Sequence, residues 1–128
     1  GALAVPWLQN YDNNHGSSWY KGGCRWDITW ANSRGESGLP YDVQCVYRDN
    51  TGTVLLTKLV EVKTTTQPTK RSFEVSLNEL ECAKCHGENF LIARVYLGND
   101  MHTAPRVVLT SSPWSLLEQQ MATLLIRF

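Results

Sequence analysis

The stretch that most constrains the fold is 90–109, whose sequence FLIARVYLGNDMHTAPRVVL predicts two strands joined by a short turn. Its first half alternates between two faces, one carrying Leu91, Ala93, Val95 and Leu97 and the other carrying Ile92, Arg94 and Tyr96. Period two is typical of a β-strand. Gly, Asn and Asp at 98–100 favour a tight turn, and a second apolar run follows Pro105. We therefore predict a β-hairpin near the end of an all-β chain.

Several other segments show strand patterns. In 19–30 one face carries Cys24, Trp26, Ile28 and Trp30, and further strands are expected at 2–8, 41–48, 53–63 and 71–77. Residues 78–89 are expected to form a loop. Ser115 followed by Glu118 predicts a capped helix over 116–125, with an extra strand as the alternative.

About seven short strands separated by turns predict a two-sheet antiparallel sandwich. The chain has 128 residues, so a single domain over 1–128 is expected. Asp27 and Glu61 are expected to be exposed strand positions.

The strand order resembles that of a fibronectin type III domain. The residues that carry the resemblance are Trp30, the Tyr41–Val43 triplet, the run FEVSLNEL at 73–80, and Ala93 to Val95 followed by Asn99. Leu91 departs from the family, which usually has a Tyr there, and so do the four cysteines. Cys24-Arg-Trp26 is similar to a motif of class I cytokine receptors, and 90–96 is similar to a strand of class II receptors and tissue factor. The resemblance implies a receptor ectodomain.

The four cysteines are Cys24, Cys45, Cys82 and Cys85. An even count in a small β-rich chain favours two disulfides and an oxidising compartment. In a sandwich, Cys24 and Cys45 would lie on opposite sheets, so a bridge between them is expected, together with a short Cys82–Cys85 bridge. Crossed pairings and free thiols are the alternatives.

The string Cys82-Ala-Lys-Cys85-His86 admits three other interpretations. Cys-X-X-Cys-His is the attachment motif of c-type haem, with Met101 or His102 as a possible second ligand. A zinc site would need two more ligands from His15, His86 and His102. A redox dithiol would need a helix N-terminus in a βαβ setting. The all-β pattern favours a structural disulfide, with no cofactor and no metal.

Composition limits the partners that we expect. Twelve basic and twelve acidic residues give a formal net charge of zero, which argues against nucleic acid as the main partner. No run of about 18 apolar residues occurs, so no membrane span is expected within this fragment. No Ser, His and Asp are placed together by the pattern, so the chain is not expected to be an enzyme.

The sequence therefore predicts an extracellular or secreted module that binds a protein ligand or a neighbouring receptor domain. The binding residues would be Arg34, Met101 and His102, in loops at one end of the sandwich. The alternative is a carbohydrate-binding sandwich that uses Trp19, Tyr20 and Trp114, since exposed aromatic side chains can stack on sugars.

Overall fold

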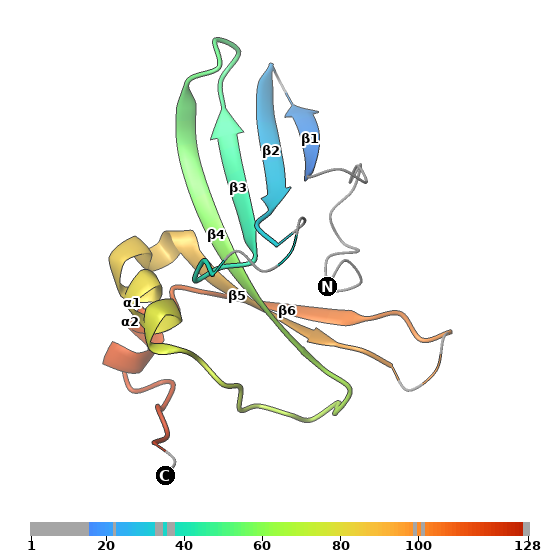
Figure 1. The fold of residues 1–128 in the computed structure, drawn as a ribbon, viewed down its shortest axis with the longest axis vertical. Helices are drawn as coiled ribbons and strands as arrows, with labels where there is room; N and C mark the ends of the chain where they lie inside the picture. The colour runs from blue at the N-terminus through green and yellow to red at the C-terminus, as the bar shows by residue number, and fades with distance from the viewer. Residues whose placement is uncertain are drawn as a thin grey trace.

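The computed structural model describes residues 16–21, 23–32, 35, 38–98, 100 and 102–126, and the side chains of 16–21 are not among the features described. The described strands form one six-stranded sheet in sequence order, β1 to β6 (Figure 1). Their bounds are β1 Gly16–Lys21, β2 Cys24–Trp30, β3 Val43–Arg48, β4 Val54–Thr65, β5 Phe90–Tyr96 and β6 Arg106–Ser111. The predicted two-sheet sandwich of seven strands is wrong, although the structure is mostly β.

The sheet is mixed because one pair of neighbouring strands is parallel. β4 and β5 run parallel in the register Leu59↔Phe90 to Thr65↔Tyr96, whereas all other neighbours are antiparallel. Parallel neighbours need a crossover connection, usually a helix. Here it consists of the extended segment 66–76, helix α1 (Leu77–His86) and the 3-10 helix η2 (Gly87–Asn89). The crossover is what prevents the strands from pairing as a sandwich.

Helix α1 occupies the segment that we predicted to be a loop. A capping box begins it: the Ser76 hydroxyl accepts a hydrogen bond from the Glu79 amide, and the Glu79 carboxylate accepts one from the Ser76 amide. This reciprocal pair satisfies two amides that would otherwise have no partner. The helix ends at Gly87, whose φ of 54° lies in the left-handed region that glycine tolerates.

Two other local predictions need correction. The alternation at 71–77 produces an extended segment without strand pairing, in which Phe73 packs edge-on against Tyr96 with ring centroids 6.4 Å apart. The C-terminal helix α2 spans Pro113–Glu118, so it starts earlier and ends earlier than expected. The hairpin of β5 and β6 and the strands at 43–48 and 54–65 are confirmed.

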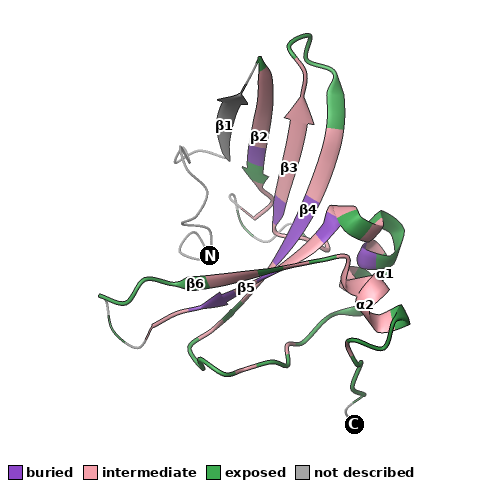
Figure 2. Ribbon diagram, turned by 180° about the vertical axis from the view of Figure 1, so that it is seen from behind, coloured by how far each residue is buried: buried purple, intermediate pink, exposed green. Residues whose placement is uncertain are grey.

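Hydrophobic clusters lie on both faces of the sheet. Figure 2 shows the buried segments of β2, β3, β4 and β5 in purple. On one face Ile28, Val43, Val60 and Ala93 pack together, with Trp30 against them. On the other face Leu59 and Phe90 pack with Ala83 of α1, and Trp114 of α2 joins them. The two helices therefore cover a single face of the sheet, and that face also carries Glu61 and Lys63, since they alternate with Val60 and Val62 along β4.

The predicted disulfides are wrong, because all four cysteines are free thiols. Cys45 is the register partner of Ile28, four residues along β2 from Cys24. At about 3.3 Å per residue, this offset is about 13 Å, well beyond the reach of a disulfide. Cys82 packs against the cluster beneath α1, and Cys85 is exposed on the same helix.

Candidate functional site: a carboxylate cluster at the head of a basic groove

The candidate site begins at the start of β3, where the chain enters the middle of the sheet. Extending the register Val43↔Val60 by one residue places Asp42 opposite Glu61. The Asp42 amide donates to the Val60 carbonyl at 2.9 Å, and the Asp42 carboxylate accepts from the Val62 amide at 2.7 Å. Asn32 donates a third bond to the other carboxylate oxygen, at 3.0 Å. Backbone and side chain together fix Asp42 beside Glu61.

Glu61 is the one charged side chain that the structure buries among the described residues, with 9% of its surface exposed. The prediction that it is an exposed strand position is therefore wrong. Burial, a hydrogen bond to Glu79 and the charge of Asp42 together raise the pKa of Glu61 to about 8. The positive charge of Lys63 lowers the pKa of Glu61, but it offsets these increases only in part. The carboxyl groups of Asp42, just before β3, and of Glu79 in α1 thus lie close enough to Glu61 to affect its pKa.

Lys63 lies between two of these carboxyl groups. Its Nζ is 3.3 Å from Glu61 Oε1 and 3.0 Å from Glu79 Oε1. Burial alone would lower the pKa of Lys63, but the hydrogen bond to Glu79 and the charges of both glutamates outweigh it and raise the pKa. Burial likewise tends to raise the pKa of Glu79, yet its hydrogen bonds with Glu61, the Ser76 amide and Lys63 lower it. Lys63 therefore remains a cation, and Glu79 remains an anion, at neutral pH.

The capping box gives Glu79 its position. Ser76 begins α1 at the end of the crossover segment, and the first turn of the helix carries Glu79 over the sheet to Lys63. The sequence contained the signal for this helix start, a Ser followed three residues later by Glu. The alternation of Phe73, Val75 and Leu77 suggested a strand there instead.

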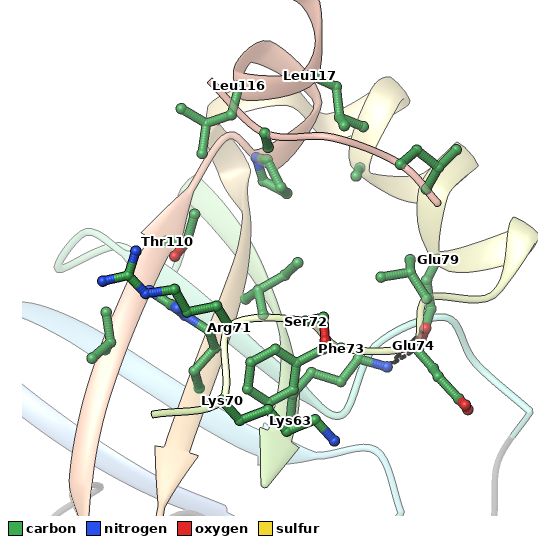
Figure 3. A pocket seen from close by; sticks show the side chains of 18 of the residues that line it. Lys63, Lys70, Arg71, Ser72, Phe73, Glu74, Glu79, Thr110, Leu116 and Leu117 are labelled. Atoms are coloured by element: carbon green, nitrogen blue, oxygen red, sulfur yellow. Dashed lines mark hydrogen bonds and ion pairs between the residues drawn. The ribbon is translucent and has the colours of Figure 1, made fainter. Parts of the chain in front are cut away.

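A groove of about 1460 Å³ starts at Lys63 and Glu79 and runs over the helix-side face of β5 and β6 (Figure 3). Its floor contains Ile92, Arg94 and Tyr96, one wall is the segment 68–75, and the other side is formed by the helices and by 121–125. Five basic side chains line it against two acidic ones: Lys63, Lys70, Arg71, Arg94 and Arg106 against Glu74 and Glu79. Of the three carboxyl groups only Glu79 lines this groove, and the buried Glu61 lies behind Lys63, 3.3 Å from its Nζ.

Hydrogen bonds from the sheet hold the wall of the groove. The Tyr96 hydroxyl donates to the Lys70 carbonyl at 2.7 Å, and Arg106 donates to the Pro68 carbonyl at 3.0 Å. Arg106 also lies over the Tyr96 ring, 4.2 Å from its centroid. These contacts keep the extended segment at a fixed distance from β5 and β6 although it has no strand partner.

Of the six predicted binding residues the structure describes the side chains of two, His102 and Trp114, and only Trp114 lines the groove. Arg34 and Met101 are outside the described residues, and Trp19 and Tyr20 are on β1, whose side chains are not described. His102 is exposed in the β5–β6 turn, which Asp100 organises by accepting from the amides at 102 and 103. Trp114 packs in the cluster beneath the helices, with Lys84 over its ring. Figure 1 shows that the turn and α2 lie at opposite ends of the β5–β6 hairpin.

The donor set fits a divalent cation of the hard, oxygen-binding kind. Among the residues described, no three His, Cys, Asp or Glu side chains surround one position that a metal ion could fill. Asp42 and Glu61 would therefore hold a cation as a pair. Mg²⁺ commonly has one or two protein carboxylates, with water and substrate phosphates as its other ligands. Within the described part of the chain, no helix is long and apolar enough to cross a bilayer.

Comparison with known proteins overturns the receptor interpretation. The family model described as Protein NO VEIN, C-terminal, matches residues 2–109. Two proteins of Arabidopsis thaliana are similar over 72 residues, or 56% of this chain: Protein NO VEIN-LIKE at 39% identity and Protein NO VEIN at 36%. The matched stretch is 10% of the length of the first and 2% of the second. No solved structure matches.

The fibronectin type III resemblance, the receptor function and the extracellular location are therefore wrong. These interpretations required an antiparallel sandwich, whereas β4 and β5 pair in parallel. They also required disulfides, whereas the four described cysteines are free. The match gives no support to the carbohydrate-binding or haem alternatives either, and Cys82 is packed against Leu59 and Phe90. Since the family model covers most of the sequence, the chain belongs to the NO VEIN C-terminal domain family.

Proposed function

We propose that this domain hydrolyses phosphodiester bonds with the help of a divalent cation held by Asp42 and Glu61. The observation that carries the proposal is that the buried Glu61 carboxyl lies beside Asp42 and contacts Lys63, which with Glu79 lines the head of a cationic groove. Burial of like charges is unfavourable unless a cation or a proton compensates it. The sequence led us to expect no enzyme, but this arrangement of charges favours a catalytic role.

A bound cation would offset the repulsion between the two carboxylates and polarise a phosphoryl oxygen. The protein supplies the other groups. Lys63 presents a fixed positive charge where negative charge develops on the phosphate, and its Nζ is held by Glu61 and Glu79 rather than by solvent. Such preorganised charge needs no reorientation during the reaction.

The reaction is a hydrolysis. The oxygen of a water molecule bonds to phosphorus while the bond from phosphorus to the leaving oxygen breaks. The water proton passes to the Glu79 carboxylate, which lines the groove and is ionised because its hydrogen bonds lower its pKa. The leaving oxygen takes a proton from solvent, which gives a phosphomonoester and an alcohol. Electrons and atoms balance without an oxidant or a further reactant.

The test is cleavage of a labelled oligonucleotide and of bis(p-nitrophenyl) phosphate in Mg²⁺ or Mn²⁺, with EDTA as the metal-free control. We expect cleavage that requires metal and is reduced by at least about a hundredfold in Asp42→Asn, Glu61→Gln and Lys63→Met. Lys58→Met is the matched control, because Lys58 lies on the same strand outside the groove. Absence of cleavage with every substrate and both metals, or equal cleavage by Glu61→Gln, would contradict the proposal.

A further inference from the structure

Arg94 lines the groove, and its guanidinium has few partners within the described residues. Its Nε is buried and has no hydrogen-bond partner among the described residues, while its Nη1 reaches only the Tyr96 hydroxyl, at 3.3 Å. An unsatisfied buried donor on a charged group costs free energy, so native structures rarely keep one without a reason. The buried Nε itself is beneath the surface, but Arg94 lines the groove, so the outer nitrogens of its guanidinium can bind an acceptor from a ligand there.

Arg94 is also the neighbour of the candidate catalytic lysine. Lys63 and Arg94 are register partners on the parallel strands β4 and β5, and neighbouring strands are about 4.8 Å apart. Two cations therefore stand side by side at the point where the groove meets the carboxylates. The guanidinium is a planar fork that suits a phosphate, whereas Lys63 is already engaged by two glutamates.

The cationic surface continues beyond Arg94. Arg106 is opposite Tyr96 on the antiparallel strand β6, and Arg71 is exposed on the facing wall. A single phosphate would need only Arg94. The volume of about 1460 Å³ is larger than the pockets typical of small ligands, so a longer polyanion fits the groove better.

We propose that the groove binds a nucleic-acid strand through its backbone phosphates, with Arg94 bound to the phosphate next to the one that is cleaved. This inference names the substrate class of the proposed hydrolase and so rests on that proposal. It assigns recognition of the polymer to Arg94 and the chemistry to the carboxylate cluster. Since Arg94 contacts phosphate, binding is expected to depend on salt and little on base sequence.

Binding is measured with the whole 128-residue chain, by fluorescence anisotropy of a labelled thymidine oligonucleotide in EDTA. Without metal, this measurement does not depend on hydrolysis. We expect Arg94→Gln to bind about tenfold more weakly and to lower the slope of log K against log salt by about one. Arg94→Lys keeps the positive charge but loses the planar guanidinium, so its affinity should fall between those of the wild type and Arg94→Gln.

Arg48→Gln is the matched control, because Arg48 pairs with Asp27 at the other end of the sheet and does not line the groove. It should bind like the wild type, and thermal unfolding of each variant shows whether it is folded. A duplex of the same length is the second ligand, and binding of either form supports the inference.

Two results would overturn the inference: no binding of either ligand by the wild-type chain in low salt, or wild-type affinity in a folded Arg94→Gln variant. Glu61→Gln separates this inference from the proposed hydrolysis, since it should retain binding in EDTA. Arg94-dependent binding without any cleavage would refute the hydrolase and leave this inference standing.

Discussion

The Asp42 carboxylate accepts a 2.7 Å hydrogen bond from the amide of Val62, the residue between Glu61 and Lys63. This bond ties the residue before β3 to the middle of β4 and holds the Asp42 carboxylate beside the position of Glu61. The Asp42 charge is one cause of the raised pKa of Glu61, and the bond keeps that charge in place. We regard this as the basis of the site's preorganisation.

Substitution of Asp42 should separate its structural role from its chemical role. Asp42→Asn keeps an oxygen that can accept from the Val62 amide, so we expect less than about 1 kcal/mol of lost stability. Asp42→Ala leaves that amide without a partner and should cost about 2–3 kcal/mol. Urea unfolding measures both. Equal stability of the two variants would show that the bond contributes nothing.

The pH dependence of stability follows from Glu61. The pKa of Glu61 rises from 4.5 to about 8 on folding, so the folded state holds a proton that the unfolded state releases. The stability from this group is fully present below pH 4.5 and is lost as pH rises towards 8, with a slope of up to about 1.4 kcal/mol per pH unit.

Urea unfolding in EDTA across this pH range measures that slope. Glu61→Gln should be stable to a similar degree throughout, because glutamine does not titrate. If wild type and variant gave parallel pH profiles, Glu61 would be ionised in the metal-free protein and our account of its environment would be incorrect.

The start of α1 should be sensitive to its cap. Ser76→Ala removes the acceptor for the Glu79 amide and should lower stability by about 1 kcal/mol. Ser76→Asp preserves an acceptor and is the control. Because the cap also positions Glu79 beside Lys63, we expect Ser76→Ala to reduce cleavage by more than Ser76→Asp does.

The thiols should all react, at very different rates. Burial raises the pKa of Cys45 to about 11 and also raises the pKa of Cys82, so both have little thiolate at pH 8. Cys85 is exposed and should be alkylated first. Mass spectrometry of the denatured, unreduced protein should show four alkylated cysteines. Two or four unreactive cysteines would restore the disulfide hypothesis.

Local sequence patterns predicted strands such as β5, but not the direction in which they pair. The parallel arrangement of β4 and β5 depends on where the crossover helix packs, through contacts of Ala83 with Leu59 and Phe90. These residues are far apart in sequence. The Ser76–Glu79 capping box was the local signal for the helix, and the alternation before it concealed that signal.

The candidate site escaped prediction for a similar reason. Glu61 and Lys63 are two residues apart and share a face, but an isolated pair of this kind usually lies on an exposed strand. Only pairing with Asp42 and coverage by Glu79 make it a buried cluster. Likewise, a net charge of zero suggested no affinity for nucleic acid, because composition cannot show that five basic residues gather in one groove.

The most direct test of the central claim is calorimetric titration of Mn²⁺ into the wild-type chain, Glu61→Gln and Lys58→Met. Our account predicts one Mn²⁺ ion per wild-type or Lys58→Met chain and affinity at least about tenfold weaker in Glu61→Gln, since one of two protein ligands has lost its charge. Mn²⁺ affinity that is the same in all three proteins, or no binding to the wild type, would contradict it.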